Sequence, residues 1–67
     1  MSEVVEALMV LRRQIDLVNA ELRVARRKLE KTAEGSEEAR ALEQRKAIFE
    51  GQARELAEGV KRLEAGR

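Results

Sequence analysis

The chain has 67 residues, with 14 Lys or Arg and 13 Asp or Glu, so its net charge is +1. It contains no Cys, His, Trp, Tyr or Pro, and Phe49 is its one aromatic residue. This composition excludes disulfides, thiolate chemistry and the usual transition-metal sites, so we expect no cofactor. The near-zero net charge argues against a dedicated nucleic-acid binder.

The length of the chain limits its stability as a monomer. A domain of this size buries only about 60% of the surface that its unfolded chain exposes. Small domains usually compensate with disulfides, metals or oligomerisation. Because composition rules out the first two, we expect this chain to associate with itself.

The first ten residues, MSEVVEALMV, are acidic rather than basic, and the longest apolar run covers only residues 7–11. Such a run is too short for a signal-peptide core or a membrane span. We therefore expect a cytoplasmic protein without a membrane partner.

The first predicted element is a helix over about residues 2–33. Its apolar residues recur at alternating steps of four and three, which is the heptad pattern of packed helix pairs. The residues that follow this pattern are Val4, Leu8, Leu11, Ile15, Val18, Leu22, Ala25 and Leu29. We call these positions, together with their counterparts in the second helix, the core seam.

A second apolar stripe runs along the same helix. Val10, Leu17 and Val24 are seven residues apart, so they lie on one line of the helix surface. A hairpin needs only one seam, and an additional apolar line therefore predicts an oligomer interface. The alternative is that these residues merely flank a broad seam.

The end of this helix is basic. Its possible RNA or anion contacts are Arg23, Arg26, Arg27 and Lys28. One interpretation is a phosphate-binding stripe. The other is that cations near a helix C-terminus complement the helix dipole and cover apolar surface with their stems.

The sequence predicts a turn over residues 34–36. Gly35 adopts left-handed backbone conformations at low steric cost, which favours a helix end. Ser36 is a good N-cap, and the two glutamates after it suit the first turn of a new helix. A second helix is therefore expected over about residues 37–65.

The second helix repeats both apolar features. Its seam positions, at alternating steps of three and four, are Ala39, Leu42, Lys46, Phe49, Ala53, Leu56, Val60 and Leu63. Ala41 and Ile48 continue the outer stripe and complete the predicted interface with the three stripe residues of the first helix. Lys46 is the one charged seam residue, and we expect Glu21 to meet its ammonium group. A ladder of alternating charges at i, i+4 spacing, from Lys46 to Arg62, predicts a solvated face with pairs along the helix.

A short turn between two heptad helices predicts an all-α fold, an antiparallel two-helix hairpin that forms a single domain over residues 1–67. In this hairpin, residue i lies opposite roughly residue 71 minus i. Two such hairpins related by a two-fold axis would form a four-helix bundle.

The segment Leu11–Leu22, read as LRRQIDLVNAEL, resembles the first helix of the small all-helical chorismate mutases. This resemblance implies that Arg12 binds a carboxylate of the substrate. Asn19 and Leu29 depart from the family pattern, because the family has Asp and a second Arg at these positions.

The expected architecture also resembles two other groups. One comprises the plasmid copy-control RNA-binding hairpins of the Rop type, and the other comprises designed helical-hairpin oligomers. The main functional hypothesis is a non-enzymatic module for self-association, with a homodimer favoured or another helical protein as partner. Rop-like RNA binding and a mutase-like activity are the alternatives.

Overall fold

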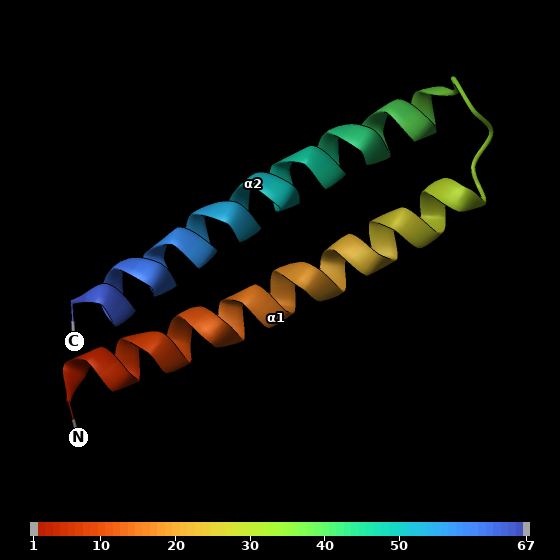
Figure 1. The fold of residues 1–67 in the computed structure, drawn as a ribbon. Helices are drawn as coiled ribbons and strands as arrows, with labels where there is room; N and C mark the ends of the chain where they lie inside the picture. The colour runs from red at the N-terminus through yellow and green to blue at the C-terminus, as the bar shows by residue number, and fades with distance from the viewer. Residues whose placement is uncertain (1, 67) are drawn as a thin grey trace.

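The computed structural model describes residues 2–66 and contains two antiparallel helices packed as a hairpin (Figure 1). Helix α1 spans Glu3–Glu30 and helix α2 spans Glu37–Ala65. The two termini lie at the same end, and the molecule measures 49 × 15 × 12 Å. The predicted all-α class and antiparallel hairpin are therefore confirmed. Within residues 2–66, no helix combines the length and apolarity that crossing a membrane requires.

Helix α1 ends at Glu30, three residues before the end expected from the sequence. The N–H groups of Lys31 and Thr32 donate to the carbonyls three residues earlier, each at 3.1 Å, which tightens the last turn. The Thr32 hydroxyl donates to the Lys28 carbonyl at 2.6 Å and satisfies an acceptor that a longer helix would have used. The expected end near residue 33 is wrong because these bonds close the helix early.

The connection over residues 31–36 reverses the chain. Gly35 has a φ of +78°, a conformation that favours glycine, but it lies within the loop rather than directly at the end of α1. The Ser36 hydroxyl accepts from the Ala39 N–H at 3.1 Å and donates to the Ala33 carbonyl at 2.8 Å. Ser36 is therefore the N-cap of α2, as the sequence predicts, and it also fixes the loop to the helix start.

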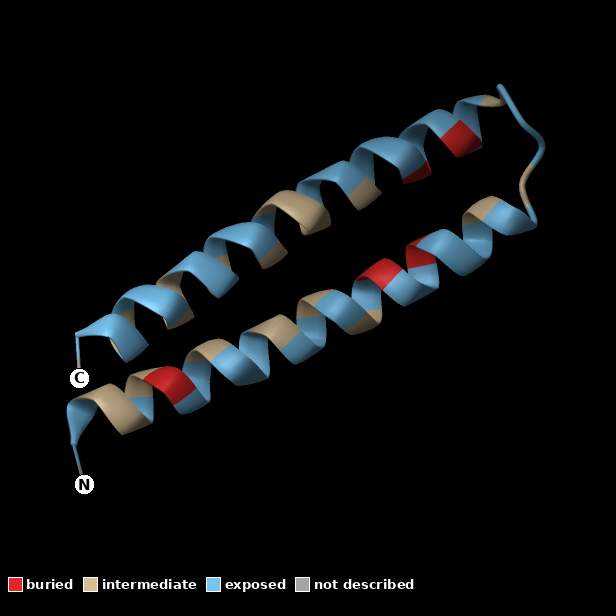
Figure 2. Cartoon of the chain, in the orientation of Figure 1, coloured by how far each residue is buried: buried red, intermediate tan, exposed pale blue. Residues whose placement is uncertain are grey.

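The core is a single line of side chains between the helices. Its buried residues are Leu8, Leu22, Ala25, Ala39 and Leu42, and all but Leu8 lie in the half of the hairpin nearest the loop (Figure 2). Every other seam residue is half-buried. None of the large side chains within residues 2–66 is fully buried. A two-layer molecule only 12 Å thick in its smallest dimension therefore leaves much of its apolar surface partly wet.

Candidate association face

The outer stripe of α1 is not covered by α2. Val10, Leu17 and Val24 are 55%, 62% and 49% exposed. Large apolar side chains are common at protein surfaces singly, but these three form a row along one line of the helix, two turns apart. Met9, also 62% exposed, precedes Arg12 by one helical turn and therefore lies off this line, toward the ion pairs described below; a shallow depression of the outer surface separates it from Val10. The intramolecular packing therefore does not account for these residues.

Helix α2 contributes to the same side of the molecule. Ile48 is 62% exposed, and Ala41, one heptad earlier, is also exposed. A shallow groove between the helices contains Leu17 on its α1 wall and is lined by Leu11, Gln14, Leu17, Val18, Gln52, Glu55 and Leu56. We use the name association face for Val10, Leu17, Val24, Ala41 and Ile48.

The other side of the hairpin carries ion pairs between the helices. Arg12 lies 3.7 Å from Glu64, and Arg26 lies 3.7 Å from Glu50. We call these four residues the ion-pair face. All four side chains are at least 40% exposed, so each pair contributes only about 0–1 kcal/mol.

Helix geometry separates the two faces. Both ion-pairing arginines of α1 come two residues after a stripe valine, and two residues turn a helix by roughly 200°. In α2, Glu50 likewise follows Ile48 by two residues. Because the ion pairs must lie on one side of the hairpin, both stripes lie on the other side.

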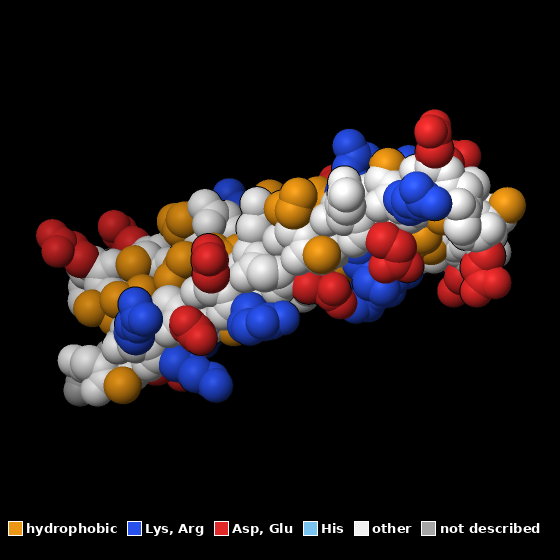
Figure 3. Space-filling view, turned by 90° about the horizontal axis from the view of Figure 1, so that it is seen from above, with side chains coloured by type: hydrophobic (Ala, Val, Ile, Leu, Met, Phe, Trp, Pro, Cys, Tyr) orange, Lys and Arg blue, Asp and Glu red, His pale blue; other side chains and the backbone are white. Residues whose placement is uncertain are grey.

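A view of the hairpin from above shows how the side-chain types are distributed. Hydrophobic atoms gather most densely near the end that carries the termini (Figure 3). Acidic and basic side chains alternate along the rest of the surface in this view. Charge of either sign is therefore dispersed there rather than gathered into one field.

Lys46 is half-buried at the seam, and its ammonium lies 3.7 Å from the Glu43 carboxylate, one turn earlier on the same helix. The expected pairing with Glu21 is wrong among the described residues. The long lysine stem lets the charged group leave the seam and pair at the helix surface. The predicted ladder also does not form as expected, because Glu50 pairs with Arg26 of the other helix.

Three of the four basic residues named as possible RNA or anion contacts share one face of α1, because Arg23, Arg26 and Arg27 have i, i+3 and i+4 spacing. Arg23, Arg26, Arg27 and Lys28 are all exposed. Lys28 lies about 100° further around the helix, and Arg26 is paired with Glu50 of α2. Arg27 and Lys28 lie in the last turn, where cations complement the helix dipole. A phosphate backbone would contact only part of this set.

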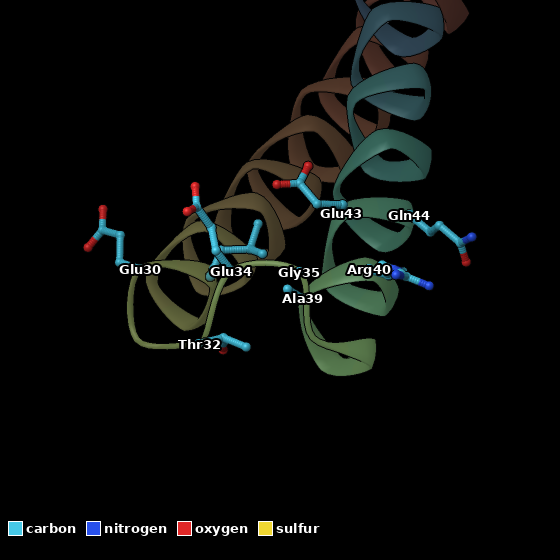
Figure 4. A pocket seen from close by; sticks show the side chains of 9 residues that line it. Glu30, Thr32, Glu34, Gly35, Ala39, Arg40, Glu43 and Gln44 are labelled. Carbon is cyan, nitrogen blue, oxygen red and sulfur yellow. The ribbon is translucent and has the colours of Figure 1, made fainter.

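The loop end has a shallow depression lined by Leu29, Glu30, Thr32, Glu34, Gly35, Ala39, Arg40, Glu43 and Gln44. Arg40 and Gln44 point away from Glu30, so these polar groups do not converge on one point (Figure 4). Within residues 2–66, no group of three His, Cys, Asp or Glu is arranged to hold a metal ion. The depression lacks the convergent polar groups that a ligand site requires.

Comparison with known proteins finds no matching family model, no similar curated protein and no similar solved structure. The resemblance to Rop-type and designed hairpins therefore rests on the two-helix architecture. The resemblance to chorismate mutases rests on residues 11–22 alone, and Arg12 of that segment pairs with Glu64 at the exposed surface. Function must be inferred from the surface of the hairpin itself.

Proposed function

We propose that this protein is a self-association module whose hairpins pair through the association face into a homodimeric four-helix bundle. The observation that supports this proposal is the row of large apolar side chains, 49–62% exposed, on the side of the hairpin away from the ion pairs. Large apolar side chains grouped on one face of a small domain often mark a protein interface. A binding role needs no catalytic group or cofactor.

The thin core gives a second reason for association. Covering the partly exposed stripe residues on two copies contributes on the order of 10 kcal/mol. Association itself costs about 4–15 kcal/mol, so the stripe alone is close to balance. Half-buried seam residues such as Leu56, which lines the same groove as Leu17, lose further water on pairing. Together these contributions favour a dimer.

Sedimentation equilibrium at micromolar concentration tests the proposal. We expect the mass of a dimer for the wild-type chain. Leu17→Glu places a charge in the centre of the stripe of each copy, so it should shift the mass to a monomer and lower the helical circular dichroism. Ala47→Glu is the matched control, because Ala47 is exposed and precedes Glu50 on the ion-pair side by one helical turn.

The control variant should remain a dimer. A folded wild-type monomer at micromolar concentration would falsify the proposal, and so would a Leu17→Glu variant that dimerises as the wild type does. Retained dimerisation of Leu17→Glu with disrupted dimerisation of Ala47→Glu would place the interface on the opposite side of the hairpin.

A further inference from the structure

We propose that the dimer forms by antiparallel packing of α1 against α1 of a second copy, with Leu17 of both copies on the two-fold axis. This inference rests on the proposed self-association and adds to it the partner element, its direction and its register. The α1 stripe runs over residues 10–24 and the α2 stripe over residues 41–48, so α1 offers the longer apolar contact.

The spacing of the α1 stripe fits this arrangement. In an antiparallel pair centred on Leu17, Val10 lies opposite Val24 of the second copy, and Leu17 lies opposite itself. All three stripe residues of α1 therefore meet apolar partners. A shift of the register by one heptad would place a stripe valine opposite Glu3 or Lys31, the residues that continue the same line at its two ends.

Charges at the ends of α1 favour the same direction. Glu3 and Glu6 occupy the first turn, Arg27 lies in the last turn, and Lys31 follows the helix as its C-cap. The antiparallel register brings Glu3 near Lys31 and Glu6 near Arg27 of the second copy, once at each end of the dimer. All four side chains are exposed, and none of them makes an ion pair within residues 2–66. A parallel pair would instead place each charge beside its own copy.

A dimer in which α1 packs against α2 of the second copy is less favourable. At equal height along the two hairpins, the stripe line of α2 continues from Ile48 to Glu55 and Arg62. Val10 and Leu17 would then face these charged side chains. Only Val24 would meet an apolar stripe residue, Ile48, whereas the antiparallel α1 pair gives all three stripe residues of α1 an apolar partner.

Spin labels measure the direction of packing. The sequence has no cysteine, so single labels at Glu30→Cys and Asp16→Cys report one distance each. Both positions are exposed and lie off the stripe. With a rise of 1.5 Å per residue, the antiparallel dimer separates the two Glu30 labels by about 40 Å. Parallel packing, or packing of α1 on α2 at equal height, gives about 25 Å or less at both positions.

The outcomes separate the two proposals. A long distance from Glu30→Cys with a short one from Asp16→Cys supports the antiparallel α1 pair. Short distances from both labels overturn this arrangement while self-association stands. If neither label shows a dipolar coupling and sedimentation gives a monomer, the proposed function itself fails.

Charge exchange gives an independent test of the register. Glu6→Lys and Arg27→Glu each create like-charged contacts at both ends of a homodimer. A heterodimer of the two variants has opposite charges at both ends. In an equimolar mixture we expect the ratio of heterodimer to homodimer to exceed random pairing by about threefold to tenfold, as two exposed ion pairs allow. Native mass spectrometry at low salt measures this ratio, and random pairing would overturn the register.

Discussion

Leu17 and Leu22 are the same residue type on the same helix, five positions apart, but Leu17 is 62% exposed and Leu22 only 5%. Leu22 belongs to the core seam and packs between the helices, whereas Leu17 belongs to the stripe on the association face. The comparison shows that one partner helix covers only one side of α1. A helix that is apolar on two sides needs a second neighbour, which the hairpin does not supply.

The strongest test of this comparison is to truncate each leucine. Leu22→Ala should lower the free energy of unfolding by about 2–4 kcal/mol, because it opens a cavity in the seam. Leu17→Ala should cost less than about 0.5 kcal/mol in the isolated hairpin, where the side chain is largely wet. Urea unfolding over a range of protein concentrations measures both.

The concentration dependence separates intramolecular from intermolecular burial. If the stripe pairs two copies, the loss caused by Leu17→Ala should grow with protein concentration, because only the dimer buries this side chain. If Leu22→Ala and Leu17→Ala lowered the free energy of unfolding equally at every concentration, the distinction between seam and stripe would be wrong.

Lys46 sharpens the comparison from inside the seam. Lys46→Leu should raise the free energy of unfolding by about 1–2 kcal/mol, because an apolar side chain then fills a half-buried position. Lys61→Leu, at an exposed position, is the control and should change stability by less than about 0.5 kcal/mol. Thermal unfolding followed by circular dichroism gives both values.

The same variant tests whether Lys46 selects the assembly. A buried polar residue in a coiled coil often specifies one oligomer at some cost in stability. If Lys46 has this role, Lys46→Leu should give more than one mass in sedimentation. A single unchanged mass would show that its charged group simply leaves the seam for Glu43.

The hairpin and its cap follow from local rules that the sequence displays. Heptad steps predict the seam, and Ser36 predicts the start of α2, because each depends on residues close together in the chain. The same heptad steps place Leu17 on a line off the seam, and the structure leaves this side chain exposed. What covers this line depends on a second molecule, which the pattern of one chain does not specify.

Other features were missed because they depend on tertiary detail. Residues 31–33 are compatible with helix by composition, and only the Thr32 hydroxyl bond and the path of the loop end α1 early. The Arg26–Glu50 pair joins the two helices, so its discovery requires the register of the hairpin. The heptad positions offered a signal, because both residues flank the seam on the same side in an antiparallel pair.

Two glycines of α2 provide a smaller comparison between the inner and outer surfaces. A Cβ at Gly59 would lie 3.5 Å from Cδ1 of Leu11, in ordinary contact, and a Cβ at Gly51 would meet nothing within 4 Å. Each Gly→Ala substitution should therefore raise the free energy of unfolding by about 1 kcal/mol through helix propensity. Gly59→Ala should raise the free energy of unfolding slightly more than Gly51→Ala does, because its methyl group also contacts Leu11.

Thermal unfolding of the two glycine variants at low and high concentration checks this expectation. If Gly51→Ala raises the free energy of unfolding at both concentrations, Gly51 stays open to solvent in the dimer as well. If Gly51→Ala stabilises the chain at low concentration but weakens it at high concentration, the dimer brings another helix close to Gly51.

The smallest expected effect lies on the ion-pair face. A double-mutant cycle with Arg26→Ala and Glu50→Ala should give a coupling energy of at most about 0.5 kcal/mol, because both groups are largely exposed. In 1 M NaCl the Debye length falls to about 3 Å, so this coupling should vanish. Apolar contact is not screened by salt, and the loss of dimer caused by Leu17→Ala should therefore persist under the same conditions. A coupling energy that survives high salt would indicate that a second copy buries Arg26 and Glu50. The dimer would then form through the ion-pair face, and the association face would stay exposed to solvent.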